Sequence, residues 1–320
     1  MKHLLIASFC DGGSTAQYVL NKITKGKEVE LDYHAFELDP KAVLLTSTRF
    51  PDTHQHGDIR NWRKGGKIFK RRPDLFCAGT SCKNTSNAGD RTGFSTLSGK
   101  KVKSLEQYIM YDRIGVPMNE SCICFWESIW FMRTMKPKYT FFEIPLLSKE
   151  FLDIFIKETG LEYIKIDSAL VSAQSRKRYY FTNIPGLCQP KDKGIMLEDI
   201  IPGAASYSKH GALNPKFGKP GQAKWGVSRI SIRKDGKHDT LTTKRPKVIQ
   251  GGVIRLITPE EAEMLMGFKP CHTQVLGLSD TDRFRILGNG WSVPTIVHIF
   301  KGLLKTELFE YPKLNLEYSK

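Results

Sequence analysis

Short runs of β-forming residues alternate with helix-forming segments through the first half of this 320-residue chain. Leu4–Phe9 and Tyr33–Leu38 are typical of strands, and Pro40 suits the first turn of the helix that follows. Strands that alternate with helices form parallel sheets with crossover helices, so the pattern predicts an α/β fold. Further strands are expected at 75–78, 139–144, 163–166 and 178–182, and helices at 122–135 and 149–159.

The composition changes near residue 186. Residues 186–254 are rich in Gly, Pro, Ser and Lys, with short strand-like pieces such as Val227–Ile232, which indicates a small irregular module. Helical periodicity returns at 259–268, 280–287 and 293–304. The sequence therefore predicts a first domain at 1–185, a module at 186–254, and C-terminal helices at 255–320 that return to the first domain.

The charge of the chain is strongly positive, at a formal +16. Residues 200–250 hold 11 Lys and Arg against two acids, and residues 63–72 hold six basic residues and no acid. Concentrated positive charge favours a phosphate-rich partner such as a nucleic acid, although a solvated surface explains it about equally well.

The sequence also bears on compartment and metal content. It has no apolar run of the roughly 18–20 residues that spans a bilayer, and its apolar N-terminal stretch is too short for a signal peptide, so we expect a cytoplasmic protein without a membrane partner. Seven cysteines, with no repeated Cys-x-x-Cys spacing, predict free thiols and no metal site.

Three features in chain order are typical of a nucleoside-binding site. A glycine-containing turn, Cys10–Thr15, follows the first strand, and Glu37 ends the second strand, where an acid can accept ribose hydroxyls. Asp58 stands where it can accept from an adenine amino group. Each feature alone is more often a tight turn, a helix cap or a solvated carboxylate.

A second set of residues suits nucleophilic chemistry. Cys82 follows the strand at 75–78, at the edge where open α/β sheets bind ligands, and a thiolate there can act as a nucleophile. Glu143 is an acid among aromatic residues at a strand end, which is expected to be paired or to hold a substrate. Arg176 and Arg178 suit partners either of Glu143 or of a base and phosphate. The alternative for the two arginines is a basic surface turn.

Taken in order, these motifs resemble those of the DNA (cytosine-5) methyltransferases over nearly the whole chain. The turn at Asp11-Gly12, then Glu37, Asp58 and the Gly79–Ser86 loop match the first four motifs, Glu143 matches the acid of the Glu-Asn-Val motif, and Gln174-Ser175-Arg176-Lys177-Arg178 matches Gln-x-Arg-x-Arg. The segments Arg255–Glu260 with Gly267-Phe268, and Gly288–Pro294, are the most specific. The Trp-Ser-Val-Pro ending is similar to the de novo branch, and the chain is of a kind expected in phage or prokaryotic DNA modification or restriction-modification.

The resemblance implies a Rossmann-like class I methyltransferase sheet, S-adenosylmethionine as cofactor, double-stranded DNA as partner, and methyl transfer to C5 of a flipped-out cytosine through a Cys82–C6 adduct. The module at 186–254 becomes the target-recognition region, and 83–121 a mobile catalytic loop. The implied catalytic residues are Cys82, Glu143, Arg176 and Arg178. The implied cofactor-binding residues are Cys10, Asp11, Gly12, Gly13, Thr15, Glu37, Leu38, Asp58, Ile59, Asn289, Gly290 and Trp291. The implied DNA-binding residues are Lys100, Lys101, Gln174, Arg233, Lys234, Lys244 and Arg245.

The sequence departs from the family pattern at three places. Ser81 stands where the family has proline before the nucleophile, Ile144-Pro145 replaces Asn-Val after the acid, and Cys10 replaces an aromatic residue in the first motif. Alternative functions are the same chemistry on RNA, a modified sulfonium donor, or an inactive DNA-binding relative. The missing Gly-x-Gly-x-x-Gly motif disfavours a nicotinamide-dependent dehydrogenase.

Overall fold

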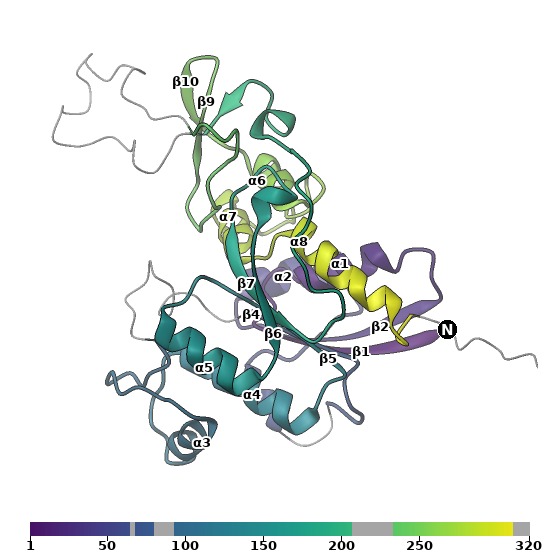
Figure 1. Ribbon diagram of the computed structural model, residues 1–320, viewed down its shortest axis with the longest axis vertical. Coiled ribbons are helices and arrows are strands. Elements are labelled where there is room, and N and C mark those ends of the chain that lie inside the picture. The colour runs from purple at the N-terminus through teal and green to yellow at the C-terminus, as the bar shows by residue number, and fades with distance from the viewer. Residues whose placement is uncertain (65–67, 80–92, 207–232, 310–320) are drawn as a thin grey trace, which may run out of the picture.

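The computed structural model describes residues 1–64, 68–79, 93–206 and 233–309, and its centre is a seven-stranded sheet of order β3-β2-β1-β4-β5-β7-β6. Figure 1 shows α4 and α5 on one face of this sheet and α1, α2 and α8 on the other. The structure therefore has the predicted α/β architecture. No helix in the described part of the chain combines the length and apolar character needed to cross a bilayer.

The first five elements form the expected parallel units. The register pairs β1 with β2 from Lys2–Val29 to Phe9–Phe36, in parallel. Asp39 caps the helix α2 by accepting from the Lys41 amide at 3.0 Å, and Pro40 follows at the first helical position, as expected. The two-residue strand β3 was not predicted. The bounds are β1 Lys2–Phe9, α1 Thr15–Ile23, β2 Val29–Phe36, α2 Pro40–Arg49 and β3 His54–Gln55.

The second part of the sheet is only partly parallel. β4 pairs with β5 in parallel, whereas β7 runs antiparallel to both of its neighbours. This edge differs from the parallel units that the alternating pattern predicted, because β6 and β7 are joined by a short connection without a crossover helix and form an antiparallel pair. The bounds are β4 Leu75–Gly79, α4 Glu120–Met135, β5 Tyr139–Ile144, α5 Lys149–Thr159, β6 Glu162–Asp167 and β7 Lys177–Thr182.

Each face of the sheet has its own hydrophobic core. Alternation along β1 sends Leu4 and Ile6 to the core shared with α1 and α8, and Ala7 and Phe9 to the core shared with α4 and α5. Both faces are therefore covered, as burial of a mainly parallel sheet requires.

The segment predicted to be a mobile catalytic loop, residues 83–121, is packed and partly helical in its described part, 93–121. Phe94 is 1 % exposed and stacks on Phe125 of α4, and the helix α3 at Leu105–Arg113 buries Tyr108 completely. Residues 93–121 are therefore packed against α4 instead of forming an open connection. Motion of the segment stays a prediction.

The C-terminal part combines a small sheet with helices that return to the first domain. Gly251 and Gly252, both with positive φ, connect β9 to β10, and α8 packs on α1. The predicted module boundary at residue 254 falls inside β10, and the predicted strand Val227–Ile232 lies outside the described residues. The bounds are β8 Ala204–Ala205, β9 Lys247–Gln250, β10 Val253–Leu256, α6 Pro259–Met266, α7 Asp280–Asn289 and α8 Val293–Phe300.

A buried carboxylate joins the packed segment to the body of the domain. Glu127 of α4 is fully buried and accepts from Trp62 Nε1 at 2.8 Å, Arg63 Nη2 at 2.7 Å and Tyr108 Oη at 2.6 Å. Three donors from two other segments therefore depend on one acidic side chain.

Replacing Glu127 by leucine is expected to lower the free energy of unfolding by about 2–4 kcal/mol, because the half-buried Arg63 guanidinium and two further donors lose an acceptor. Urea denaturation measures this. Asp153→Asn, which breaks an exposed Lys149–Asp153 pair, is the control and should change stability by no more than about 0.5 kcal/mol. Equal effects of the two substitutions would contradict the role of Glu127.

Candidate active site

A cavity of about 660 Å³ opens at the carboxyl ends of β1, β2, β4 and β5. This is the edge at which open α/β sheets bind ligands, and the volume lies within the usual range for small-molecule sites. The predicted site residues that line it are Cys10, Gly12, Glu37, Leu38, Asp58, Ile59, Glu143, Asn289 and Trp291.

The turn after β1 is built from left-handed residues. Cys10, Gly12 and Ser14 have φ values of 51°, 57° and 52°. No heavy atom lies within 4 Å of the position that a Cβ on Gly12 would take, so the turn leaves open space beside its backbone. Such space, next to the start of a helix, is what a ligand needs for close approach to backbone amides.

Asp11 holds this turn from inside and does not line the cavity. Its carboxylate accepts from the hydroxyls of Ser8 at 2.5 Å, Tyr33 at 2.6 Å and Ser14. Burial raises the pKa of Asp11 to about 6, although these hydrogen bonds oppose the rise. The structure thus gives Asp11 a positioning role, and its predicted cofactor contact finds no support in this geometry.

Glu37 fastens the turn to the end of β2. Its Oε2 accepts from the Gly12 amide at 2.7 Å, and its Oε1 accepts from the Leu38 and Asp39 amides at 2.9 and 2.8 Å. A carboxylate offers about four acceptor sites, so these bonds leave about one, on Oε2. Glu37 therefore has room for one ribose hydroxyl in this geometry, where the sequence predicted contacts with both.

Asp58 lines the cavity but is already paired. It caps the short 3₁₀ helix Ile59–Arg63, accepting from the Arg60 amide at 2.8 Å, and its Oδ2 lies 2.5 Å from Arg60 Nη2. The hydrogen bonds from Arg60 lower the pKa of Asp58. An ionised acceptor thus faces the cavity, as the predicted contact with an adenine amino group requires. Arg60 was not predicted.

Glu143, a buried acid that lines the cavity, pairs with the half-buried Arg178. Glu143 lies in β5 opposite Tyr180 of β7, and Arg178, two residues before Tyr180, is its diagonal neighbour. Arg178 Nε lies 3.1 Å from Glu143 Oε1, and Glu143 is 5 % exposed. Burial raises the pKa of Glu143, and the neighbouring guanidinium groups only oppose this rise. The predicted pairing of this acid with Arg178 is confirmed.

Arg176 and Gln174 have structural contacts instead of the predicted functional ones. Arg176 is 2 % exposed and donates to the carbonyls of Leu241, Gly288 and Gly290 at 3.2, 3.2 and 2.7 Å. Gln174 is fully buried, accepts from the Leu241 amide at 2.7 Å, and donates to the Leu265 carbonyl at 3.3 Å. The predicted contact of Gln174 with DNA finds no support in this geometry, because the side chain is fully buried.

The predicted nucleophile, Cys82, lies outside the described residues. The strand that leads to it ends at Gly79, which lines the cavity, and a Cβ on Gly79 would lie only 2.9 Å from Nε1 of Trp291. Trp291 belongs to the predicted C-terminal motif and contacts Phe141 of β5, so this ring packs closely against the end of β4.

The sulfur chemistry of the cavity differs from the prediction of free thiols. Cys10 and Cys124 of α4 form a disulfide, and both line the cavity. The sequence could not indicate this pair, because 114 residues separate the two cysteines. Among the described cysteines, Cys77, Cys122, Cys188 and Cys271 are free.

The predicted DNA-binding cations lie in different surroundings. Lys234 and Lys244 are exposed, and the Nζ of Lys100 lies over the Tyr111 ring at 5.2 Å. The others have acidic partners that phosphate must displace. These pairs are Lys101 with Glu150 at 2.6 Å, Arg233 with Asp235 and with Asp239 at 2.5 Å, and Arg245 with Asp280 at 3.4 Å.

Other residues complete the cavity. Arg285 of α7 pairs with Asp39, so the C-terminal helices close one side of the cavity. Asp39 was not predicted as a cavity residue, although its position directly before Pro40, as the cap of a helix, could have indicated it. Gly13, Thr15 and Gly290, which were predicted to bind cofactor, lie beside the cavity around a separate space of about 10 Å³. The remaining lining residues that were not predicted are Phe36, Ala42, Gly57, Met118, Glu120, Ile123 and Ile286.

The cavity fits the expected cofactor. Glu37, with one available acceptor site, suits a ribose hydroxyl of S-adenosylmethionine, and the ionised Asp58 suits its adenine amino group. The apolar side chains between these two acids suit the base, and the open backbone turn at Gly12 suits the amino-acid part.

Comparisons with known proteins agree with this geometry. The model of the C-5 cytosine-specific DNA methylase family matches residues 24–109, which include Glu37, Asp58 and Gly79. A DNA modification methyltransferase encoded within a prophage of E. coli has the same fold, with a TM-score of 0.61 and 16% identity over 94% of this chain and 98% of that one.

Two eukaryotic structures share the fold as well. A mutant of DNMT2 from Spodoptera frugiperda has a TM-score of 0.59 and 18% identity over 96% of this chain and 100% of that one. The methyltransferase EhMeth of Entamoeba histolytica has a TM-score of 0.55 and 15% identity over 95% of this chain and 98% of that one. Part of the chain therefore matches the C-5 cytosine-specific DNA methylase family, and nearly the whole chain shares the fold of these methyltransferase structures.

Proposed function

We propose that the chain transfers a methyl group from S-adenosylmethionine to C5 of cytosine in double-stranded DNA. The observation that carries this proposal is the single cavity shared by Glu37, Asp58 and Glu143, with Gly79 at its wall leading to Cys82. This arrangement supports a methyl donor bound at Glu37 and Asp58 with a pyrimidine ring beside Glu143, which is paired with Arg178. When bound, the cofactor supplies an electrophilic methyl group on a sulfonium.

The chemistry of the base depends on residues of this chain. Cytosine C5 is too weak a nucleophile to take the methyl group unaided. The Cys82 thiolate adds to C6, forming an Sγ–C6 bond and moving an electron pair toward C5. After C5 has taken up the methyl group, the C5 proton leaves to a base, the Sγ–C6 bond breaks, and the ring becomes aromatic again.

Glu143 and Arg178 orient and polarise the ring in this proposal. A carboxyl group with a raised pKa is able to donate a proton toward N3, which stabilises the adduct, and it accepts from the exocyclic amine with its other oxygen. Arg178, at 3.1 Å from Glu143, contacts O2. Glu143 is 5 % exposed, so a stacked base cannot reach it, and the target cytosine must rotate out of the duplex.

Duplex DNA is favoured over RNA by two observations. The matching family model is that of a DNA methylase, and the module at 186–254 is rich in Lys and Arg suited to phosphate contacts. Among the predicted DNA-binding cations, Lys100, Lys234 and Lys244 have no acidic partner within the described part of the chain, and Lys234 and Lys244 are exposed.

The nucleophile is tested by trapping the adduct. With cofactor and a random-sequence pool of duplexes containing 5-fluorocytosine, the wild-type protein is expected to form a complex that survives denaturation, because fluorine cannot leave C5 as a proton does. Cys82→Ser should form no complex while binding cofactor as before. Intact mass analysis measures the covalent complex for both proteins, and calorimetric titration measures their cofactor binding. Capture only with an equivalent RNA pool would overturn the choice of DNA, and capture by Cys82→Ser would remove Cys82 as nucleophile.

The ribose contact is tested by Glu37→Ala. We expect the cofactor Kd to rise about 10- to 100-fold, because the variant loses one charge-assisted hydrogen bond and the anchor of the Gly12 turn. Calorimetric titration measures the change. Glu30→Ala, on the exposed part of the same strand, should leave the Kd unchanged, and a matching loss in both variants would contradict the contact.

The role of Glu143 is tested by the pH dependence of kcat/KM. Because its pKa is raised, the neutral donor form persists to higher pH than for an ordinary glutamate, and the rate should fall as pH rises through that pKa. Glu143→Gln should lower the rate by about 10²- to 10⁴-fold and abolish this fall. An unchanged profile in the variant would assign the titration to another group.

A further inference from the structure

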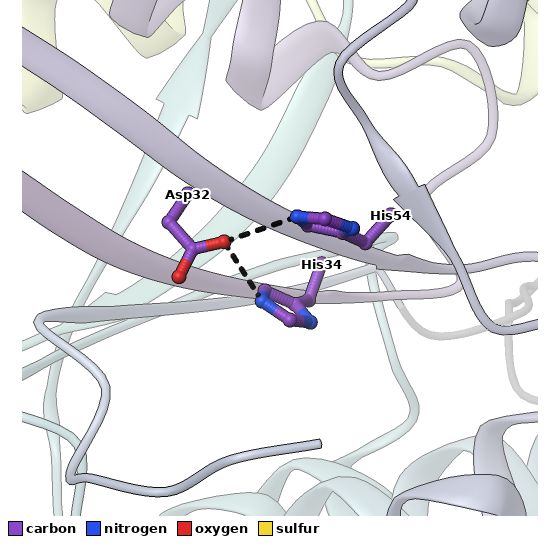
Figure 2. A group of neighbouring side chains, drawn as sticks. All are labelled: Asp32, His34 and His54. Carbon is purple, nitrogen blue, oxygen red and sulfur yellow. Dashed lines mark hydrogen bonds and ion pairs between the residues drawn. The ribbon is translucent and has the colours of Figure 1, made fainter.

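Two histidines and an aspartate that do not line the cavity converge at the outer edge of the central sheet. Asp32 and His34 are two residues apart on β2 and therefore lie on one face, and the register places His54 of β3 directly beside His34. Figure 2 shows all three side chains directed toward one another. Asp32 Oδ1 lies 3.0 Å from His34 Nε2 and 3.3 Å from His54 Nε2.

We propose that Asp32, His34 and His54 bind a divalent transition-metal ion of the zinc type. Their candidate ligand atoms all lie within 4.8 Å of one another. Four ligands at about 2.0–2.1 Å around a tetrahedral ion are about 3.3–3.4 Å apart, so the observed spacings need only small side-chain rotations. Two imidazole nitrogens and one carboxylate oxygen are a ligand set that zinc uses.

The surroundings leave a fourth position for water. The side chains of Asp32 and His54 are 45 % and 57 % exposed, so an ion has a path from solvent, whereas His34 is only 10 % exposed and gives the site a fixed wall. Three protein ligands with one open position bind an ion without enclosing it.

A neighbouring histidine supports His34 as a ligand. The Nδ1 of His34 lies 2.9 Å from Nε2 of His56, and the two rings are parallel within 5°. A metal-bound histidine carries its proton on the other nitrogen and donates it to an acceptor. With an ion on Nε2, the Nδ1–H of His34 donates to His56, which also packs on Phe36 at 4.8 Å.

The ion would fasten the edge of the sheet. β3 has two residues and pairs with β2 only at His34–His54 and Ala35–Gln55. The chain continues directly into Gly57 and Asp58, which line the cavity. A metal joining β2 to β3 therefore holds the base of the segment that carries Asp58. This inference does not depend on the identity of the substrate.

The test is a calorimetric titration of the chelator-treated full-length chain with Zn²⁺ alone. We expect one ion per chain at this site, and His54→Gln should weaken its affinity at least about tenfold. His3→Gln is the matched control, because His3 is an exposed histidine paired with one acid, Glu30, at 3.2 Å, and this variant should bind as the wild type does. Absence of binding, or equal affinity of His54→Gln and wild type, would overturn the proposal.

Cobalt substitution identifies the ligands independently. Co²⁺ in the proposed site should give visible absorption typical of four-coordinate nitrogen and oxygen ligands, and His54→Gln should lose it. Cys188, whose Sγ lies 3.9 Å from His298 Nε2, offers a competing sulfur site. A sulfur charge-transfer band that persists in His54→Gln would place the ion there and overturn the assignment. His54 is exposed, so metal-free melting temperatures should match between the variant and wild type.

Discussion

The buried guanidinium of Arg176 holds the separate parts of this molecule in one arrangement. It enters from the start of β7 and bonds to backbone carbonyls of the module, at Leu241, and of the C-terminal segment, at Gly288 and Gly290. Hydrogen bonds to a charged donor contribute about 1.5–3 kcal/mol each, and a buried cation without them is costly. The close approach at Gly288, where a Cβ would lie 2.3 Å from the Thr242 backbone, depends on the same junction.

The cavity follows from this arrangement and from Glu37. One carboxylate bonds to three amides, which join the turn after β1 to the end of β2, and the Arg285–Asp39 pair brings α7 against the same corner. These polar groups of the cavity wall are thus held in position by the protein itself. Preorganisation of this kind reduces the ordering that binding requires.

Local pattern predicted much of this fold. The strand Tyr139–Ile144 and the helix Lys149–Thr159 were predicted with their observed bounds, because strong periodicity and flanking breakers coincide there. The two-residue strand β3 has no such signal. The antiparallel direction of β7 depends on how the chain connects β6 to β7, which the composition of the strands does not reveal.

The sequence motifs identified Glu37, Asp58 and Glu143 as cavity residues. The motifs could not distinguish the role of Arg178, which pairs with Glu143, from that of Arg176, which donates to backbone carbonyls. The partners of each arginine come from segments far away in the sequence. The Cys10–Cys124 disulfide is likewise visible only in three dimensions.

The contact between Gly79 and Trp291 has a consequence for how the protein is made. The wall of the cavity combines a strand completed within the first 79 residues with a ring that follows more than 200 residues later. During synthesis, the N-terminal strands and helices emerge from the ribosome with one side of the nucleoside site missing. A nascent chain therefore lacks the complete cavity until its helices beyond Trp291 have emerged and packed against the end of β4.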